Sequence, residues 1–381
     1  MLTAFVGALC RYISELAPSQ ARGRLVTILS LFITGGQVVA YIVGWLFSSV
    51  SGGWRWIVGL GAAPAIVQFA LLFALPETPR WLVQAGQEAE ALDVLIKICR
   101  AHPGNDRLSK QVLHDIQQEV AEEEEALGSN KPADGNTQWL HHISQRAHDL
   151  FRVGGNRRAL IIAAMLQGLQ QLSGFNSLMY FSATIFSMLS FSSPTLTSLS
   201  VAMTNFVFTL AAFAFIDGIG RRRILLYSIP VMVMSLIVCA LSFSSLEISP
   251  MALGPQARDV NDPAGGDSFL PIAILLCLTV YTASYAFGLG NVPWQQSELF
   301  PLNVRSLGSA LATATNWGSN FIVGLTFLPM MEWLSPGWTF TAYAVICVAG
   351  WFGIWAIYPE MSGLSLEEVK GLLADSWGVR P

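Results

Sequence analysis

Amide and hydroxyl side chains recur at helical spacing along three uncharged stretches of this sequence. They are Thr27, Ser30, Thr34, Gln37 and Tyr41 in residues 25–54; Gln167, Gln170, Gln171 and Ser177, with Asn176 close by, after residue 159; and Ser309, Thr313, Asn316 and Asn320 in residues 306–331. Such groups donate and accept hydrogen bonds without charge, which suits a neutral polyol or sugar. Bonding between helices is the alternative. Three helices with the same kind of polar face favour a shared polar cavity.

A second set of residues is charged and falls at predicted helix ends. The pairs are Glu15 with Arg22, Asp217 with Arg221 and Arg222, and Glu298 with Arg305. Opposite charges there could form ion pairs that close an inner gate between two halves of a protein. Arginine at a cytoplasmic helix end is also expected from membrane topology alone. Because the Glu/Arg spacing occurs twice, we favour the gate.

The elements that carry these residues are predicted to be membrane-spanning helices. Of the 381 residues, 53% are hydrophobic and 12% charged. Uncharged runs occupy 25–54, 56–76, 159–216, 224–246, 268–297, 306–331 and 333–359. A spanning helix needs about 20 apolar residues, and the run 159–216 is long enough for two, with a break around Phe191–Pro194. We therefore expect an all-α polytopic membrane protein with about eight complete helices and a partial one in residues 1–10.

Basic residues predict how these helices are oriented. If successive loops alternate between the two sides, one side holds every Lys and Arg except Arg55 and Arg258, that is, 19 of the 21. The positive-inside rule then places the central loop, residues 77–158, and the tail, residues 360–381, in the cytoplasm. Within the loop we predict amphipathic helices at 81–100 and 108–127. The five histidines all lie in this loop without ligand spacing, so no metal site is expected.

An internal repeat divides the chain. Ser14-Glu15-Leu16 with Pro18 and Arg22 recurs 283 residues later as Ser297-Glu298-Leu299 with Pro301 and Arg305, and Pro76-Glu77 recurs as Pro359-Glu360. Two parallel halves with a substrate site between them are typical of secondary transporters. Residues 159–359 then form a six-helix half, whereas residues 1–76 hold the end of a fourth helix and helices five and six. Since 139 residues separate Ala159 from Glu298 but 14 precede Glu15, about 125 residues of the first half are expected to be absent, which would impair transport.

Other functions lack their motifs. The sequence has no GxxxxGK[ST] loop for ATP, and no GxSxG or HExxH motif. Nor does it contain a basic, aromatic-interleaved patch for nucleic acid. We expect no enzymatic activity and no cofactor.

Taken together, the motifs resemble the sugar porter family of the major facilitator superfamily. The matching segments are Tyr12 to Gly23, Pro76 to Arg80, Gln170 to Asn176, Asp217 to Arg222, Asn316-Trp317, and Pro359 to Glu368. Within the family, Gly288 to Gln296 and Thr313 to Trp317 look most like fungal proton-coupled myo-inositol transporters.

The resemblance implies roles for individual residues. Sugar contacts carry over onto Gln37, Gln170, Gln171, Asn176, Asn205 and Asn316, with Asn320 added from the polar face and Tyr180, Trp294 and Trp317 as aromatic surface. The family's inner-gate charges carry over onto Glu15, Arg22, Asp217, Arg221, Arg222, Glu298 and Arg305. One residue fewer than usual separates Trp294 from Glu298, which turns a helix face by about 100°. The proton-coupling carboxylate of the family lies on its first helix, which has no counterpart in this sequence.

We therefore predict a multi-pass plasma-membrane carrier that moves a polyol by alternating access, with proton-coupled myo-inositol symport expected of the full-length form. Its partners would be the small polyol or sugar, a proton and the lipid bilayer. A hexose or quinate facilitator and a non-transporting nutrient sensor remain alternatives, as does an incorrect gene model.

Overall fold

The computed structural model describes most of the chain. Its described residues are 22–73, 76–99, 109–121 without 115 and 119, 138–189, 191, 193–245, 269–293, 299–361 and 371–374; the side chains of 22–29, 71–72, 98–99, 138–143, 216–217 and 302–303 are outside that description. The described part is helical throughout, and it forms two compact units. One unit comprises residues 1–29 and 55–147, and the other comprises 30–54 and 148–381.

The first unit contains most of α3 (Gly53–Leu72), α4 (Pro79–Gln84) and α5 (Glu88–Cys99), and the start of α7 (Gln138–Arg152). Thr78 caps α4, since its side chain accepts a hydrogen bond from the backbone N–H of Trp81 at 3.3 Å. Gly86, with φ +77°, ends that helix. The single helix predicted at 81–100 is therefore two helices, which pack through Leu82, Ala91 and Val94.

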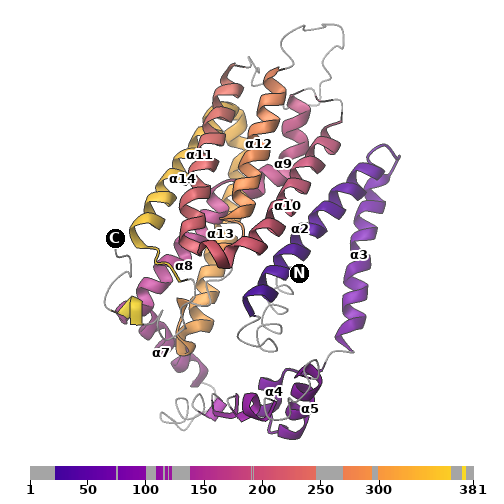
Figure 1. Ribbon diagram of the computed structural model, residues 1–381. Coiled ribbons are helices and arrows are strands. Elements are labelled where there is room, and N and C mark those ends of the chain that lie inside the picture. Colours follow the sequence, from indigo (N-terminus) through magenta and orange to yellow (C-terminus); the bar gives the residue numbers. More distant parts are fainter. Residues whose placement is uncertain are drawn as a thin grey trace. The chain divides into compact units, whose positions relative to one another are not determined.

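The second unit is a bundle built from α2 and six membrane-length segments (Figure 1). α2 (Arg22–Phe47) enters this unit at Ser30. The other helices are α8 (Gly154–Leu172), α9 (Phe175–Met188), α10 (Pro194–Ile219), α11 (Arg221–Ser245), α12 (Phe269–Phe287), α13 (Leu302–Trp333) and α14 (Ser335–Ile357). The predicted break between two helices near Phe191–Pro194 is confirmed, because α9 ends at Met188 and α10 begins at Pro194.

Two groups of helices make the most extensive contacts in this bundle. α11 lies between α12 and α14, and α8 packs along α13. Gly168 faces the second contact, where a Cβ would meet the methyl group of Thr315 at 3.6 Å and the hydroxyl of Ser319 at 3.8 Å, both ordinary van der Waals distances. The polar faces of α8 and α13 lie together at this contact.

One helix break was not predicted. The helix that begins near residue 154 stops at Leu172 and restarts at Phe175, and Gly174 between them has φ +88°. An L residue rarely adopts that conformation. α8 has 19 residues and α9 has 14, so together they exceed the roughly 20 residues that a spanning helix needs.

Five described helices are long and apolar enough to cross a membrane. They are the Ser30–Phe47 part of α2, the Pro194–Phe215 part of α10, and all of α11, α12 and α14. α13 and the interrupted α8–α9 pair carry more polar residues, and these form the site described next.

Candidate functional site

Asn316 of α13 is the centre of a buried network of amides. Its side-chain nitrogen donates to Gln167 Oε1 at 2.6 Å and to Gln170 Oε1 at 2.9 Å, and its oxygen accepts from Gln171 Nε2 at 2.9 Å. All four side chains are at most 5% exposed. Three glutamines of one α8 face thus converge on a single asparagine of the neighbouring helix.

Two of these glutamines also bind the backbone just beyond α12. Gln170 donates to the carbonyl of Gly290 at 2.9 Å, and Gln167 donates to the carbonyl of Pro293 at 3.0 Å. In that segment α12 has given way to turns, so its carbonyls need partners outside the helix. Gln167 and Gln170 therefore join three elements: α8, α13 and the segment after α12.

The network opens toward its edge at Asn176 and Asn320. Asn176, near the start of α9, donates to Gln171 Oε1 and, at 3.3 Å, to Asn320 Oδ1 of α13. Both asparagines are half-buried, unlike Asn316. Among the described residues, Asn176 Oδ1 and Asn320 Nδ2 have no hydrogen-bond partner in this conformation. The edge therefore presents both an acceptor and a donor.

Gln37 and Asn205 form a separate pair between α2 and α10. Asn205 Nδ2 donates to Gln37 Oε1 at 3.1 Å. Nearby on α2, the hydroxyl of Tyr41 bonds to the carbonyl of Met179 and lies 3.1 Å from the hydroxyl of Ser182. The polar face predicted for α2 thus lies against α9 and α10, whereas Phe32 on another face is 76% exposed.

The predicted aromatic residues lie apart from the amide centre. Tyr180 stands one turn after Asn176 on α9 and is 59% exposed, and Trp317 follows Asn316 on α13 and is 40% exposed. Neither has a described hydrogen bond to the network. Trp294 lies outside the described residues.

The predicted gate residues are described only in part. Arg22 and Asp217 are placed by their backbone alone, and Glu15 and Glu298 lie outside the description. Arg222 donates to the carbonyl of Trp355 at 2.9 Å, and Arg305 donates to the carbonyl of Phe300 at 3.2 Å. The described residues therefore do not test the ion pairs that the sequence predicts.

A different carboxylate occupies the start of α11. Glu360 accepts hydrogen bonds from the backbone N–H groups of Arg221 at 3.0 Å and Arg222 at 3.1 Å. It thereby binds two of the N–H groups that a helix start leaves without intrahelical partners, and its charge complements the helix dipole. Gly220, with φ +93°, makes room, since a Cβ there would lie 2.7 Å from Glu360 Oε2.

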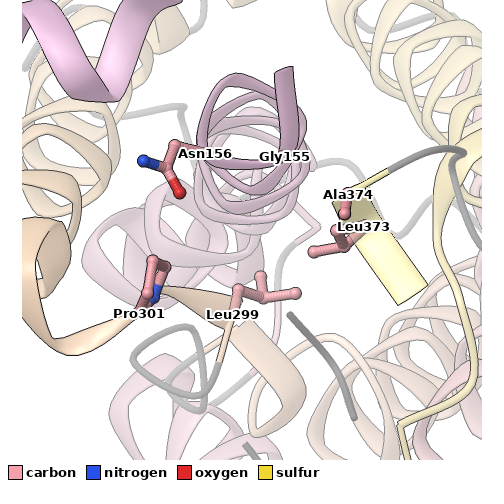
Figure 2. Close-up of a pocket in the computed structure, with 6 residues that line it drawn as sticks. All are labelled: Gly155, Asn156, Leu299, Pro301, Leu373 and Ala374. Atoms are coloured by element: carbon pink, nitrogen blue, oxygen red, sulfur yellow. The ribbon is translucent and has the colours of Figure 1, made fainter. Parts of the chain in front are cut away.

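Near the starts of α8 and α13 lies a small pocket into which the tail of the chain packs (Figure 2). Its walls are Gly155 and Asn156 of α8, Leu299 and Pro301 before α13, and Leu373 and Ala374 of the tail. Arg158 donates to the carbonyls of Leu373 at 2.9 Å and Ala374 at 2.8 Å, and Leu373 is buried. The described histidines, cysteines and carboxylates form no cluster able to hold a metal ion.

Comparison with known proteins decides the family. A family model described as "Sugar (and other) transporter" matches residues 2–373. The chain belongs to this sugar transporter family.

Relatives and solved structures agree with that membership. Myo-inositol transporter 1 of Cryptococcus neoformans is 43% identical over 369 residues, covering 97% of this chain and 62% of the relative. Myo-inositol transporter 1 of Saccharomyces cerevisiae is 42% identical over 371 residues, covering 97% and 60% respectively. The chain thus spans about three fifths of the length of these relatives.

The major facilitator fold is confirmed by the structural likeness. The proton:xylose symporter XylE bound to 6-bromo-6-deoxy-D-glucose matches with a TM-score of 0.70 and 25% identity, over 96% of this chain and 70% of that one. The inward-open xylose transporter XylE from E. coli matches with a TM-score of 0.68 and 25% identity, over 95% and 68%. This member of the sugar transporter family is a multi-pass integral membrane protein whose described secondary structure is helical.

Sequence reasoning missed two features of the candidate site. Gln167 was noted on the polar face but not among the binding residues, although it is fully buried against Asn316. The backbone carbonyls of Gly290 and Pro293 carry no side-chain signal at all. The only hint was the glycine-rich segment at 288–290, which is typical of an interrupted helix.

Proposed function

We propose that the complete protein is a secondary active transporter of a polyol, with myo-inositol as its substrate and a proton as the coupling ion, working by alternating access. The observation that carries the proposal is the uncharged amide network of α8, α9 and α13 in a chain 42–43% identical to proteins named myo-inositol transporters. Proton coupling is supported by the likeness to a proton:xylose symporter.

The chemistry of the network suits a ring that bears hydroxyl groups on every side. Each hydroxyl both donates and accepts, as an amide does, so the two kinds of group can exchange partners without burying charge. Asn176 and Asn320 supply the acceptor and donor at the edge, and Gln171 and Asn316 lie behind them. Gln37 and Asn205 add a second pair of amides, and Tyr180, Trp294 and Trp317 are proposed as aromatic surface for the apolar faces of the ring.

The proposal includes an inner gate and an orientation. The gate is assigned to the charges at the helix ends: Glu15, Arg22, Asp217, Arg221, Arg222, Glu298 and Arg305. We propose that these ends, the loop 77–158 and the tail lie in the cytoplasm of a plasma-membrane protein, and the excess of Lys and Arg among them supports this orientation. The hydrogen bonds of Glu360 support an ordered structure at that end, because its carboxylate accepts from the backbone N–H groups of two gate arginines, Arg221 and Arg222.

Uptake of radiolabelled myo-inositol tests the proposal. The 381-residue chain and a form extended by the coding sequence upstream of Met1 are expressed in cells that lack inositol uptake, with empty vector as the control. Saturable uptake that is faster at acid than at neutral pH is expected of the extended form, with unlabelled glucose, xylose and quinate as weaker competitors, and the 381-residue chain is expected to transport poorly. Preferential transport of a hexose or quinate would overturn the substrate. Absence of uptake of all four compounds by both forms, each present at the membrane, would overturn transport in favour of a sensor.

A further inference from the structure

The break between α8 and α9 lies inside the proposed substrate site. Gln171 is near the end of α8 and Asn176 near the start of α9, and the two amides hydrogen-bond across the break. Because they belong to different helices, their contact depends on the direction in which α9 leaves the junction at Ser173–Gly174. Whatever holds that junction also sets the position of Asn176 relative to Gln171 and Asn320.

Tyr281 of α12 holds the junction by a direct hydrogen bond. Its hydroxyl donates to the backbone carbonyl of Ser173 at 2.8 Å, and its side chain is 2% exposed. A carbonyl at an interrupted helix within the membrane has lost its intrahelical partner and has no water to replace it. The phenol supplies that partner from a helix that does not itself contribute an amide to the network.

Aromatic packing fixes the residues on either side. The ring of Phe175 stacks on Tyr285 of α12 with centroids 3.8 Å apart and planes 13° from parallel. Gly174 lies against the ring of Tyr343 of α14, where a Cβ would come within 2.9 Å. α9 therefore begins from a junction that is bonded at Ser173, closely packed at Gly174 and stacked at Phe175.

We propose that Tyr281 is a positioning residue for substrate recognition, whose hydroxyl holds the α8–α9 junction so that Asn176 meets Gln171 and Asn320 in the geometry that binds the polyol. This inference rests on the proposed transport function. It assigns a role to the phenolic hydroxyl alone, because the aromatic ring would still fill the same place in the core if the hydroxyl were removed.

Tyr343 provides a matched control at the same junction. It is also a tyrosine, it is 4% exposed, and its ring contacts Gly174. Unlike Tyr281, its buried hydroxyl has no hydrogen-bond partner among the described residues. Removing each hydroxyl in turn separates a hydrogen bond to the junction from general loss of a buried polar atom.

Kinetics of uptake in the full-length protein test the proposal. Tyr281→Phe is expected to raise the KM for myo-inositol about three- to tenfold, as expected for one hydrogen bond, with little change in the maximal rate per transporter at the surface. Tyr343→Phe is expected to keep the wild-type KM. A wild-type KM in Tyr281→Phe, or an equal rise in both variants, would overturn the positioning role. A joint fall in maximal rate and surface level without a KM change would also overturn it, as it indicates a structural role.

A second measurement keeps the two proposals distinguishable. If the wild type moves a different polyol, the inositol assignment fails, but the KM comparison is made with that polyol and still tests Tyr281. If it moves none, backbone hydrogen exchange of the purified proteins decides. The amide of Leu178, which donates to the carbonyl of Gly174 at 3.1 Å, is expected to exchange faster in Tyr281→Phe than in Tyr343→Phe. Equal exchange in the two variants would refute the role of Tyr281.

Discussion

Burial of individual amides separates two tasks within the site. Gln167, Gln170 and Asn316 are at most 2% exposed, and they bind one another or backbone carbonyls. Asn176 and Asn320 are half-buried and retain polar atoms without a described partner. The first group meets the requirement that buried polar groups be paired. The second can change partners without leaving a buried donor or acceptor unpaired, which is what reversible substrate binding needs.

Alanine at the two asparagines of α13 tests this division. Asn316→Ala leaves Gln171 Nε2, Gln167 Oε1 and Gln170 Oε1 without their partner, so we expect the free energy of unfolding to fall by about 1–3 kcal/mol and uptake to be lost. Asn320→Ala removes one long hydrogen bond at the edge. It is expected to keep the melting temperature and raise KM. Equal melting temperatures for the two variants in detergent would contradict the division.

The residue pattern predicted which amides share a face, but not how they pair. Spacing placed Gln167, Gln170 and Gln171 together because a helix brings residues three and four apart onto one side. Their common partner, Asn316, lies 145 residues beyond Gln171. That pairing depends on the packing of α8 along α13, a tertiary contact that no local pattern encodes. The resemblance to the sugar porter family supplied Gln170, Gln171 and Asn316 as one group but did not include Gln167.

At the scale of elements, the start of α11 depends on a contact between distant segments. Glu360 follows the last helix of the bundle, yet it binds the first N–H groups of α11. Gly220→Ala places a methyl group where Glu360 Oε2 now lies and strains a left-handed backbone. We expect a loss of stability of about 1–3 kcal/mol, measured by thermal denaturation in detergent.

Gly218→Ala is the matched control for that substitution. Gly218 lies two residues away within α10, and a Cβ there would meet nothing within 4 Å. Since alanine favours a helix over glycine, Gly218→Ala is expected to keep or slightly raise the melting temperature. If Gly220→Ala were as stable as Gly218→Ala, the present position of Glu360 at the start of α11 would not be needed for stability.

Docking of the tail on α8 makes another prediction at this scale. Arg158 binds two successive carbonyls at the end of the turn formed by residues 371–374. Arg158→Ala is expected to speed amide exchange and proteolysis around Leu373 by about tenfold, as for the loss of roughly 1.4 kcal/mol. Arg157→Ala removes the same charge from an exposed neighbour and is expected to leave the tail protected. Equal protection in both variants would show that Leu373, not Arg158, holds the tail.

The positions of the spanning helices were more predictable from the sequence than the breaks within them. Long uncharged runs predicted α2, α3 and α10 to α14 because a bilayer demands apolar length. The Ser/Pro-rich segment also marked the loop between α9 and α10. The break at Ser173–Gly174 was missed, since one glycine inside a helical pattern is a weak local signal. What holds it open is Tyr281 and Tyr343, more than 100 residues away in the sequence.

At the scale of the whole molecule, the outer surface of the second unit is apolar where a soluble protein would be polar. Leu276 on α12, Leu325 on α13 and Val345 on α14 are each more than 60% exposed. Large hydrophobic patches of this kind mark contact with lipid or with a partner. In a multi-pass sugar transporter, they are expected to face the hydrocarbon chains of the bilayer.

Leu276 lies near the middle of α12 and is therefore the position at which to test that surface. Leu276→Arg places a charge at the centre of a spanning helix, which disfavours insertion by about 2.5–3.5 kcal/mol. The amount of protein integrated into membranes, measured after alkaline extraction, is expected to fall sharply, while Leu276→Ala integrates nearly as well as the wild type. On a water-facing surface the arginine would be harmless. Normal integration of Leu276→Arg would therefore mean that this face of α12 meets water or protein and not lipid.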